Sequence, residues 1–247
     1  LTTEELVSCF DGLNIGLAVA TDPRDLFFRI HNYLSDKDGY KRTTLPTRIN
    51  PTAQISPLAY VSETNVIIDA DVAIEPFVTI YPDTVIGHSS IIRAGCTIGG
   101  TGYEFKHTDD SLMAVAHVGG VVIADNVEIQ NNTCIDRAIY PWDNTEIGSY
   151  TKLDNLVHIA HACKIGKRTM IVANVGLGGR VVIGDDAWIG FGSTIRNGLT
   201  IGDRARVNMG AVVTRSVGDD ESVTGNFAIP HDQFLKLLKR NLQLLEE

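Results

Sequence analysis

The fold is decided by a run of six-residue units that begins at residue 145 and reads TEIGSY, TKLDNL, VHIAHA, CKIGKR, TMIVAN and VGLGGR. The third residue of each unit is a branched aliphatic, and this rule continues without a slip to residue 213. The twelve positions are Ile147, Leu153, Ile159, Ile165, Ile171, Leu177, Ile183, Ile189, Ile195, Ile201, Val207 and Val213. A fixed period of this kind predicts a repeat architecture.

Period six excludes an α-helix, whose apolar face recurs at three and four residues. It suits short strands joined by tight turns, because strand side chains alternate between two faces. The residue two before each aliphatic, from Thr145 to Ala211, is mostly small or β-branched and is therefore expected to face inward too. One unit buries too little surface alone, so stacking supplies the core. The sequence predicts a solenoid of short strands.

The chain is expected to divide into three parts. Residues 1–50 form a small α/β element, residues 51–229 form the solenoid, and residues 230–247 form a helix that caps its open end. Two stretches, 99–120 and 136–144, interrupt the repeat and are predicted to leave it as loops, where functional residues tend to lie.

The N-terminal element has two predicted pieces. Residues 16–21 are expected to form a short strand. Asp22 followed by Pro23 is typical of a helix start, and the apolar spacing continues that helix to about Leu34.

Charge and cysteine usage bound the function. Residues 1–163 carry 10 Lys/Arg against 21 Asp/Glu, whereas residues 164–240 carry 11 against 7. The basic C-terminal half suits an anionic small molecule or an acidic carrier, or is merely scattered surface charge; overall acidity argues against nucleic acid. The four cysteines lack paired spacing, and neither a membrane span nor a signal peptide is expected, which favours a cytoplasmic protein with free thiols.

Two positions one coil apart are candidates for catalytic groups. His161 comes two residues after Ile159, so it does not face the core, and it is a candidate general base or simply a surface or interface histidine. Three units later, Gly179 lies about 4.8 Å away along the same edge. Its N–H is a candidate donor to an oxyanion, although a glycine needed for a corner explains it as well.

Several motifs give the chain a family resemblance. They are GGTGYEF at 99–105, GGVVIADNVEI at 119–129, DRA at 136–138, KLDNLVHIAH at 152–161 and VGLGG at 175–179. Over roughly residues 50–230 the chain resembles hexapeptide-repeat acyltransferases, in particular the UDP-3-O-acylglucosamine N-acyltransferases of lipid A synthesis. The resemblance implies a left-handed parallel β-helix, although general crossover preference is right-handed. It also implies a homotrimer with sites between subunits, His161 as catalytic base and Gly179 as oxyanion donor.

Further residues are weaker candidates. The acceptor-binding candidates are Asp154 and Asn155 from a neighbouring subunit, His158, Asp136, and the loop residues Tyr103 and Phe105, with His107 and His117 as further loop candidates. A turn explains Asp154 equally well, and a loop-closing Asp136–Arg137 pair explains Asp136. Arg196 and Arg215 are candidates for binding the phosphates of the acyl donor.

The sequence departs from the resembling family in two places. Residues 193–199 read STIRNGL, so they lack the family's second active-site histidine, and residues 15–35 resemble only the last strand and helix of its uridine-binding domain. We therefore expect an N-acyltransferase acting on a nucleotide-linked amino sugar, with acyl-CoA as donor and no metal or tightly bound cofactor. The alternatives are a lipid A enzyme that uses acyl carrier protein, a metalloenzyme of the γ-carbonic anhydrase type, and a non-catalytic solenoid.

Overall fold

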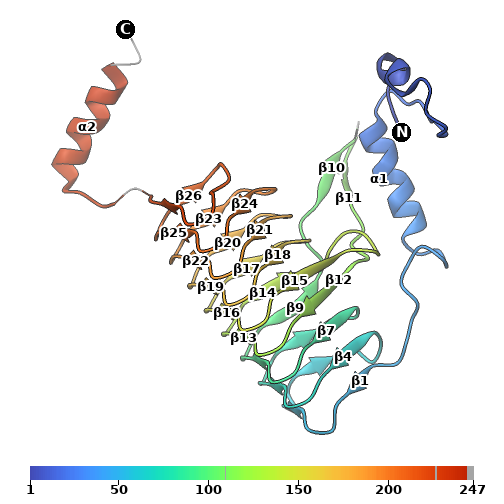
Figure 1. Cartoon of the computed structure of the whole chain (residues 1–247), viewed down its shortest axis with the longest axis horizontal. Coiled ribbons are helices and arrows are strands. Elements are labelled where there is room, and N and C mark those ends of the chain that lie inside the picture. The colour runs from blue at the N-terminus through green and yellow to red at the C-terminus, as the bar shows by residue number, and fades with distance from the viewer. Residues whose placement is uncertain (109, 226, 244–247) are drawn as a thin grey trace.

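The six-residue period produces a three-sided β-helix. The computed structural model describes residues 1–108, 110–225 and 227–243, and its strands form three parallel sheets that run along one spool (Figure 1). Each coil contributes one strand to each sheet. The predicted left-handed parallel β-helix is confirmed.

The three sheets are named in chain order. Sheet one contains β1 (Arg48–Ile49), β4 (Val66–Ile68), β7 (Thr84–Ile86), β12 (Gly120–Ile123), β15 (Asn144–Ile147), β18 (Lys164–Ile165), β21 (Val182–Ile183) and β24 (Thr200–Ile201). Sheet two contains β2 (Gln54–Ile55), β5 (Ala73–Ile74), β8 (Ile91–Ile92), β13 (Glu128–Ile129), β16 (Lys152–Leu153), β19 (Met170–Ile171), β22 (Trp188–Ile189), β25 (Arg206–Val207) and β27 (Ser222–Val223). Sheet three contains β3 (Tyr60–Val61), β6 (Thr79–Ile80), β9 (Thr97–Gly100), β14 (Cys134–Asp136), β17 (His158–Ile159), β20 (Gly176–Leu177), β23 (Thr194–Ile195) and β26 (Val212–Val213).

The core is the stack of residues that the period predicts. All twelve aliphatics from Ile147 to Val213, and all twelve residues two before them, are at most 6% exposed. The polar members of the second set bond to the backbone: the Thr151 hydroxyl donates to the Gly166 carbonyl at 2.7 Å, and the Thr169 hydroxyl donates to the Gly184 carbonyl at 2.8 Å. Within residues 145–213 the inward hydroxyl groups therefore have backbone partners, whereas the Thr84 hydroxyl, two before Ile86, has none among the described residues.

The last coil is shorter than the sequence pattern indicated. Val217 is buried and bridges to Ile201, and β27 pairs with β25 through Val223 and Val207. These steps are 16 residues rather than 18, which is why the six-residue rule stops at Val213 although the winding continues.

Both predicted insertions leave the β-helix at the same edge. We call this the loop edge: it is where the chain passes from sheet three to sheet one. Residues 101–119 leave it between β9 and β12 and contain an antiparallel hairpin, β10 (Phe105–His107) and β11 (Leu112–Ala114). Residues 137–143 leave it one coil later, between β14 and β15. The two insertions therefore stack on one another.

The N-terminal helix is bound to these loops. α1 (Pro23–Leu34) begins as predicted, with the Asp22 side chain accepting from the Asp25 N–H at 2.9 Å. The helix lies beside the β10–β11 hairpin (Figure 1). Asn32 makes two bonds to the loop backbone: its amide donates to the Ala114 carbonyl at 2.8 Å, and its carbonyl accepts from the Ala116 N–H at 2.9 Å.

We expect Asn32→Ala to loosen the first insertion. The substitution leaves the Ala116 N–H without its partner, which costs about 1–3 kcal/mol of local stability. Amide hydrogen exchange of residues 112–118 should speed up accordingly, while Arg24→Ala, an exposed change on the same helix, leaves it unchanged. Equal exchange in both variants would show that Asn32 does not hold the loop.

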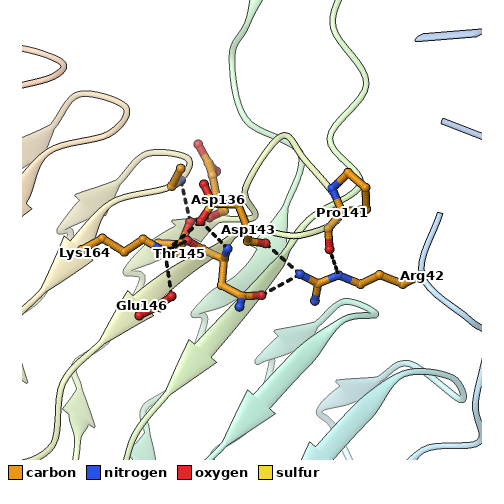
Figure 2. Close-up of polar contacts among 9 residues, drawn as sticks. Arg42, Asp136, Pro141, Asp143, Thr145, Glu146 and Lys164 are labelled. Atoms are coloured by element: carbon orange, nitrogen blue, oxygen red, sulfur yellow. Dashed lines mark hydrogen bonds and ion pairs between the residues drawn. The ribbon is translucent and has the colours of Figure 1, made fainter. Parts of the chain in front are cut away.

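The second insertion is held by charged side chains (Figure 2). Arg42 donates to the carbonyl oxygens of Pro141 at 2.8 Å and Asp143 at 2.7 Å. Lys164 binds the carboxylates of Asp143 at 2.8 Å and Glu146 at 2.6 Å. The segment before the β-helix and the sheet beneath the loop thus fix its position together.

Two expectations about the ends of the chain are wrong. Residues 16–21 form no strand and contribute a single bridge, Val19 to Thr2, while an unpredicted 3-10 helix, η1, spans Glu4–Phe10. The C-terminal helix, α2 (His231–Gln243), forms but lies away from the last coil (Figure 1), with its described side chains exposed. It therefore does not cap the β-helix within this chain. The expected division into three parts remains a prediction.

Candidate active site

His161 lies on the loop edge, two residues after β17, beneath the first insertion. Its side chain is 7% exposed. The His161 Nε2 lies 3.4 Å from the Glu104 carboxylate of that insertion, and its ring meets the His117 ring edge to face at 5.5 Å between centroids. His161 Nδ1 is buried with no hydrogen-bond partner among the described residues. A proton on Nε2, facing Glu104, leaves Nδ1 as the free basic nitrogen.

The electrostatics of this pocket keep the imidazole neutral. Burial lowers the pKa of His161 below its ordinary value of 6.5; Glu104 opposes this effect, and the positive charge of Arg180 adds to it. Burial alone raises the pKa of Glu104, but its contact with the Lys106 ammonium outweighs this, so the Glu104 pKa is lowered and the group is a carboxylate at neutral pH. A neutral imidazole held beside a carboxylate is suited to accept a proton.

Gly179 lies one coil above His161 and leaves room for the imidazole. A Cβ on Gly179 would lie 2.4 Å from His161 Cε1 and 2.5 Å from Nε2, so a larger residue forces the ring to move. The Arg180 N–H donates to the His161 carbonyl at 2.9 Å and fixes the two coils in register.

The Gly179 N–H has no acceptor among the described residues. At the next edge the corresponding N–H groups are used: Lys167 donates to Asp185, and Asp185 donates to Asp203, each at 2.8 Å. The loop edge thus has an unpaired backbone donor beside the imidazole. At the next edge, aspartate side chains accept from the corresponding backbone donors.

The structure brings Asp136 and His158 together below this edge. Asp136 is 5% exposed, and its Oδ2 lies 3.8 Å from Nε2 of His158, which is half exposed on the adjacent strand. Burial raises the Asp136 pKa, and His158 partly opposes the rise. The suggested Asp136–Arg137 pair is wrong: Arg137 donates to the Gly99 carbonyl at 2.7 Å and lies 3.8 Å from Asp83.

Asp154 and Asn155 lie on a different edge, between sheets two and three. Asp154 Oδ1 accepts from both the backbone and side-chain N–H groups of Asn155 at 2.7 Å, and its Oδ2 accepts from the Ala173 N–H at 3.1 Å. The Asn155 side-chain oxygen Oδ1 accepts from the Asn131 side-chain amide at 3.0 Å. Within one chain these residues link neighbouring coils. Their contribution to the site of a second subunit stays a prediction.

The remaining predicted residues lie in the first insertion and near the last coil. Tyr103 and Phe105 form an exposed aromatic pair in the first insertion, with ring centroids 4.9 Å apart. His107 is exposed in the same hairpin, whereas His117 is buried beside His161. Arg215 lines an open cavity of about 280 Å³ at the last coil.

Sequence reasoning missed Glu104. The residue was visible only as the acidic position of GGTGYEF, and nothing in the spacing of a 19-residue insertion indicates which of its side chains returns to His161. In the described part of the chain one group of potential metal ligands lies together, Cys134, Asp136 and His158, and it contains a single histidine. The γ-carbonic anhydrase alternative, whose three histidines would meet between subunits, stays a prediction.

Comparison with known proteins agrees with the predicted resemblance. Residues 65–100, 144–179 and 180–215 match the bacterial transferase hexapeptide (six repeats) family. A segment of 59 residues is 44% identical to UDP-3-O-acylglucosamine N-acyltransferase of Wolinella succinogenes, and one of 55 residues is 44% identical to that of Pseudomonas putida strain F1. These matches cover 24% and 22% of this chain but only 19% and 16% of those proteins. The resemblance to hexapeptide-repeat acyltransferases is confirmed.

The fold also matches a solved structure. UDP-N-acetylglucosamine acyltransferase from Campylobacter jejuni superposes with a TM-score of 0.54 at 21% identity, over 77% of this chain and 81% of that one. In the described part of this chain, no helix is long and apolar enough to cross a membrane.

Proposed function

We propose that this chain, which resembles hexapeptide-repeat acyltransferases, is an N-acyltransferase that moves an acyl group from a thioester to the amino group of a nucleotide-linked amino sugar. The observation that carries the proposal is the pairing of a buried, neutral His161 with the unpaired Gly179 N–H one coil above. A base and an oxyanion donor on one rigid edge are the two groups that aminolysis of a thioester requires.

The reaction needs no covalent enzyme intermediate. The sugar amine attacks the thioester carbonyl carbon while His161 accepts the proton that the nitrogen loses. The Gly179 N–H donates to the oxyanion of the tetrahedral intermediate. Collapse of the intermediate breaks the carbon–sulfur bond, and the imidazolium returns its proton to the departing thiolate. The products are an amide and a free thiol, and His161 is neutral again.

In this proposal the acyl donor lies along the loop edge. Residues 161, 179, 197 and 215 occupy equivalent positions in successive coils, so Arg215 lies three coil spacings, or about 14 Å, from His161. A pantetheine arm laid along this edge brings the donor's phosphates to Arg215, with exposed Arg196 one coil below. Acyl-CoA fits this arrangement, and acyl carrier protein with its phosphopantetheine is the alternative donor.

In this proposal the acceptor sugar lies below His161. Asp136 and His158 supply a carboxylate and an imidazole for sugar hydroxyls, and Tyr103 and Phe105 supply exposed aromatic faces for the nucleotide base. Asp154 and Asn155 join the site only in a homotrimer. An apolar hollow of about 330 Å³ on sheet two, lined by Met170, Trp188 and Asp154 among others, supports packing of a second copy there. The chain acts in the cytoplasm in this proposal.

A thiol-release screen tests the function. Acyl-CoA and acyl carrier protein donors of several chain lengths are crossed with nucleotide-linked amino sugars, and free thiol is measured. We expect at least one acyl-CoA to release thiol when the amino sugar is present. The N-acetylated form of the same sugar should give no release. Release with acyl carrier protein alone would select a UDP-3-O-acylglucosamine N-acyltransferase of lipid A synthesis, and no release from any pair would favour a non-catalytic solenoid.

A further inference from the structure

We propose that Cys134, Asp136 and His158 form a binding site for a borderline divalent cation such as Zn²⁺. Cys134 and His158 are paired residues on the adjacent strands β14 and β17, and both project from the outer face of sheet three. Asp136 ends the strand that contains Cys134. One ligand atom from each residue lies within 4.8 Å of the others. This site goes beyond the proposed transfer reaction, which needs no metal. It shares Asp136 and His158 with the proposed acceptor site, so a bound ion would lie within that site.

The spacing of the three groups suits one ion. The Cys134 sulfur lies 3.8 Å from one Asp136 oxygen, and His158 Nε2 lies 3.8 Å from the other. Ligands of a tetrahedral zinc ion lie about 3.3–3.6 Å apart, given metal–ligand bonds of about 2.0–2.3 Å. The three ligand atoms lie within 4.8 Å of one another, so the half-exposed His158 side chain and the Cys134 thiol must move closer by about 1 Å to bind one ion. Sulfur, nitrogen and oxygen ligands together favour zinc over magnesium or calcium.

Among the described residues, the buried Asp136 carboxylate has only weak partners. A thiol and an imidazole each lie 3.8 Å from it, and the adjacent Arg137 donates to the Gly99 carbonyl instead. A buried charge without close compensation is costly, and a bound cation removes that cost. The strand that holds Asp136 is itself fixed, because Thr145 donates to the Asp136 backbone carbonyl at 2.6 Å (Figure 2).

A buried histidine, His117, lies near this cluster without belonging to it. His117 is 7% exposed; its Nδ1 donates to the Val115 carbonyl at 2.9 Å, and its Nε2 is buried without a hydrogen-bond partner among the described residues. A Cβ placed on Gly102 would lie 3.0 Å from that Nε2 and 3.1 Å from Asp136 Oδ2, so this glycine keeps open a space between the two. An imidazole whose Nδ1–H is held by a carbonyl presents the lone pair of Nε2 as metal-binding histidines do.

Direct metal binding tests the proposal without any substrate, so a failed acyltransferase assay does not affect it. The full chain with Cys9→Ser, which removes the exposed thiol, is titrated with Zn²⁺ against a chromophoric chelator and with Co²⁺ for the thiolate charge-transfer band. We expect one equivalent of metal and a cobalt–thiolate band. Both should be lost in Cys134→Ser, and the equivalent should be lost in Asp136→Asn.

The matched control is His88→Gln. His88 Nε2 lies 3.6 Å from the Asp125 carboxylate, so it is a histidine–carboxylate pair of similar spacing. This variant should keep the full equivalent and the band. Circular dichroism establishes that each variant is folded. The absence of a cobalt–thiolate band in the unsubstituted site, or a band that persists in Cys134→Ser, would overturn the assignment.

Discussion

Replacing His161 by Ala is expected to lower turnover by about 10²–10⁴-fold, because general-base catalysis contributes on this order. The buried imidazole lies between Glu104 and Gly179, so its removal takes away the basic nitrogen at that point. Turnover is measured as thiol release at saturating donor. His88→Ala, an exposed change outside the loop edge, serves as the control and should retain full turnover. A folded His161→Ala variant with near-normal turnover would exclude His161 as the base.

The pH dependence should report the same group. Burial lowers the pKa of His161 below 6.5, and only the neutral ring accepts a proton, so kcat/KM falls as the pH drops through that lowered pKa. Glu104 raises the pKa of His161, so Glu104→Gln should move the acidic limb to still lower pH. An unchanged limb would show that Glu104 does not act on the imidazole.

Gly179→Ala is expected to reduce kcat by about 10²-fold or more without unfolding the chain. The new methyl group would lie 2.4 Å from the His161 ring, which must then move by about 1 Å, and misplacement of a catalytic group on this scale has that cost.

Gly176→Ala is the matched control for this substitution. Gly176 precedes Gly179 in the same coil, and a Cβ there meets no atom within 4 Å. The two variants should share a melting temperature within a few degrees, and only Gly179→Ala should lose turnover. Equal turnover in both would mean that the imidazole does not need this space.

Much of the fold was predictable because it depends on local repetition. The third-position aliphatic of each six-residue unit from Ile147 to Val213 is buried, since a period of six with alternating side chains allows only one inward face. The start of α1 was predictable for a similar reason: an Asp22 cap and Pro23 act within one turn. The strand expected at residues 16–21 is reduced to a single bridge between Val19 and Thr2, because pairing depends on a partner segment that local sequence does not specify.

The amino-acid sequence by itself determined the winding of the chain, the place of its two insertions and the alignment of residues 161 and 179, because all of these follow from counting residues along a regular rise. Tertiary structure alone decided that Glu104 and His117 return to His161, that Asp136 meets His158 rather than Arg137, and that α2 leaves the last coil exposed. Those contacts join residues through irregular loops or across coils. Their geometry is set by packing against the rest of the molecule and not by any period.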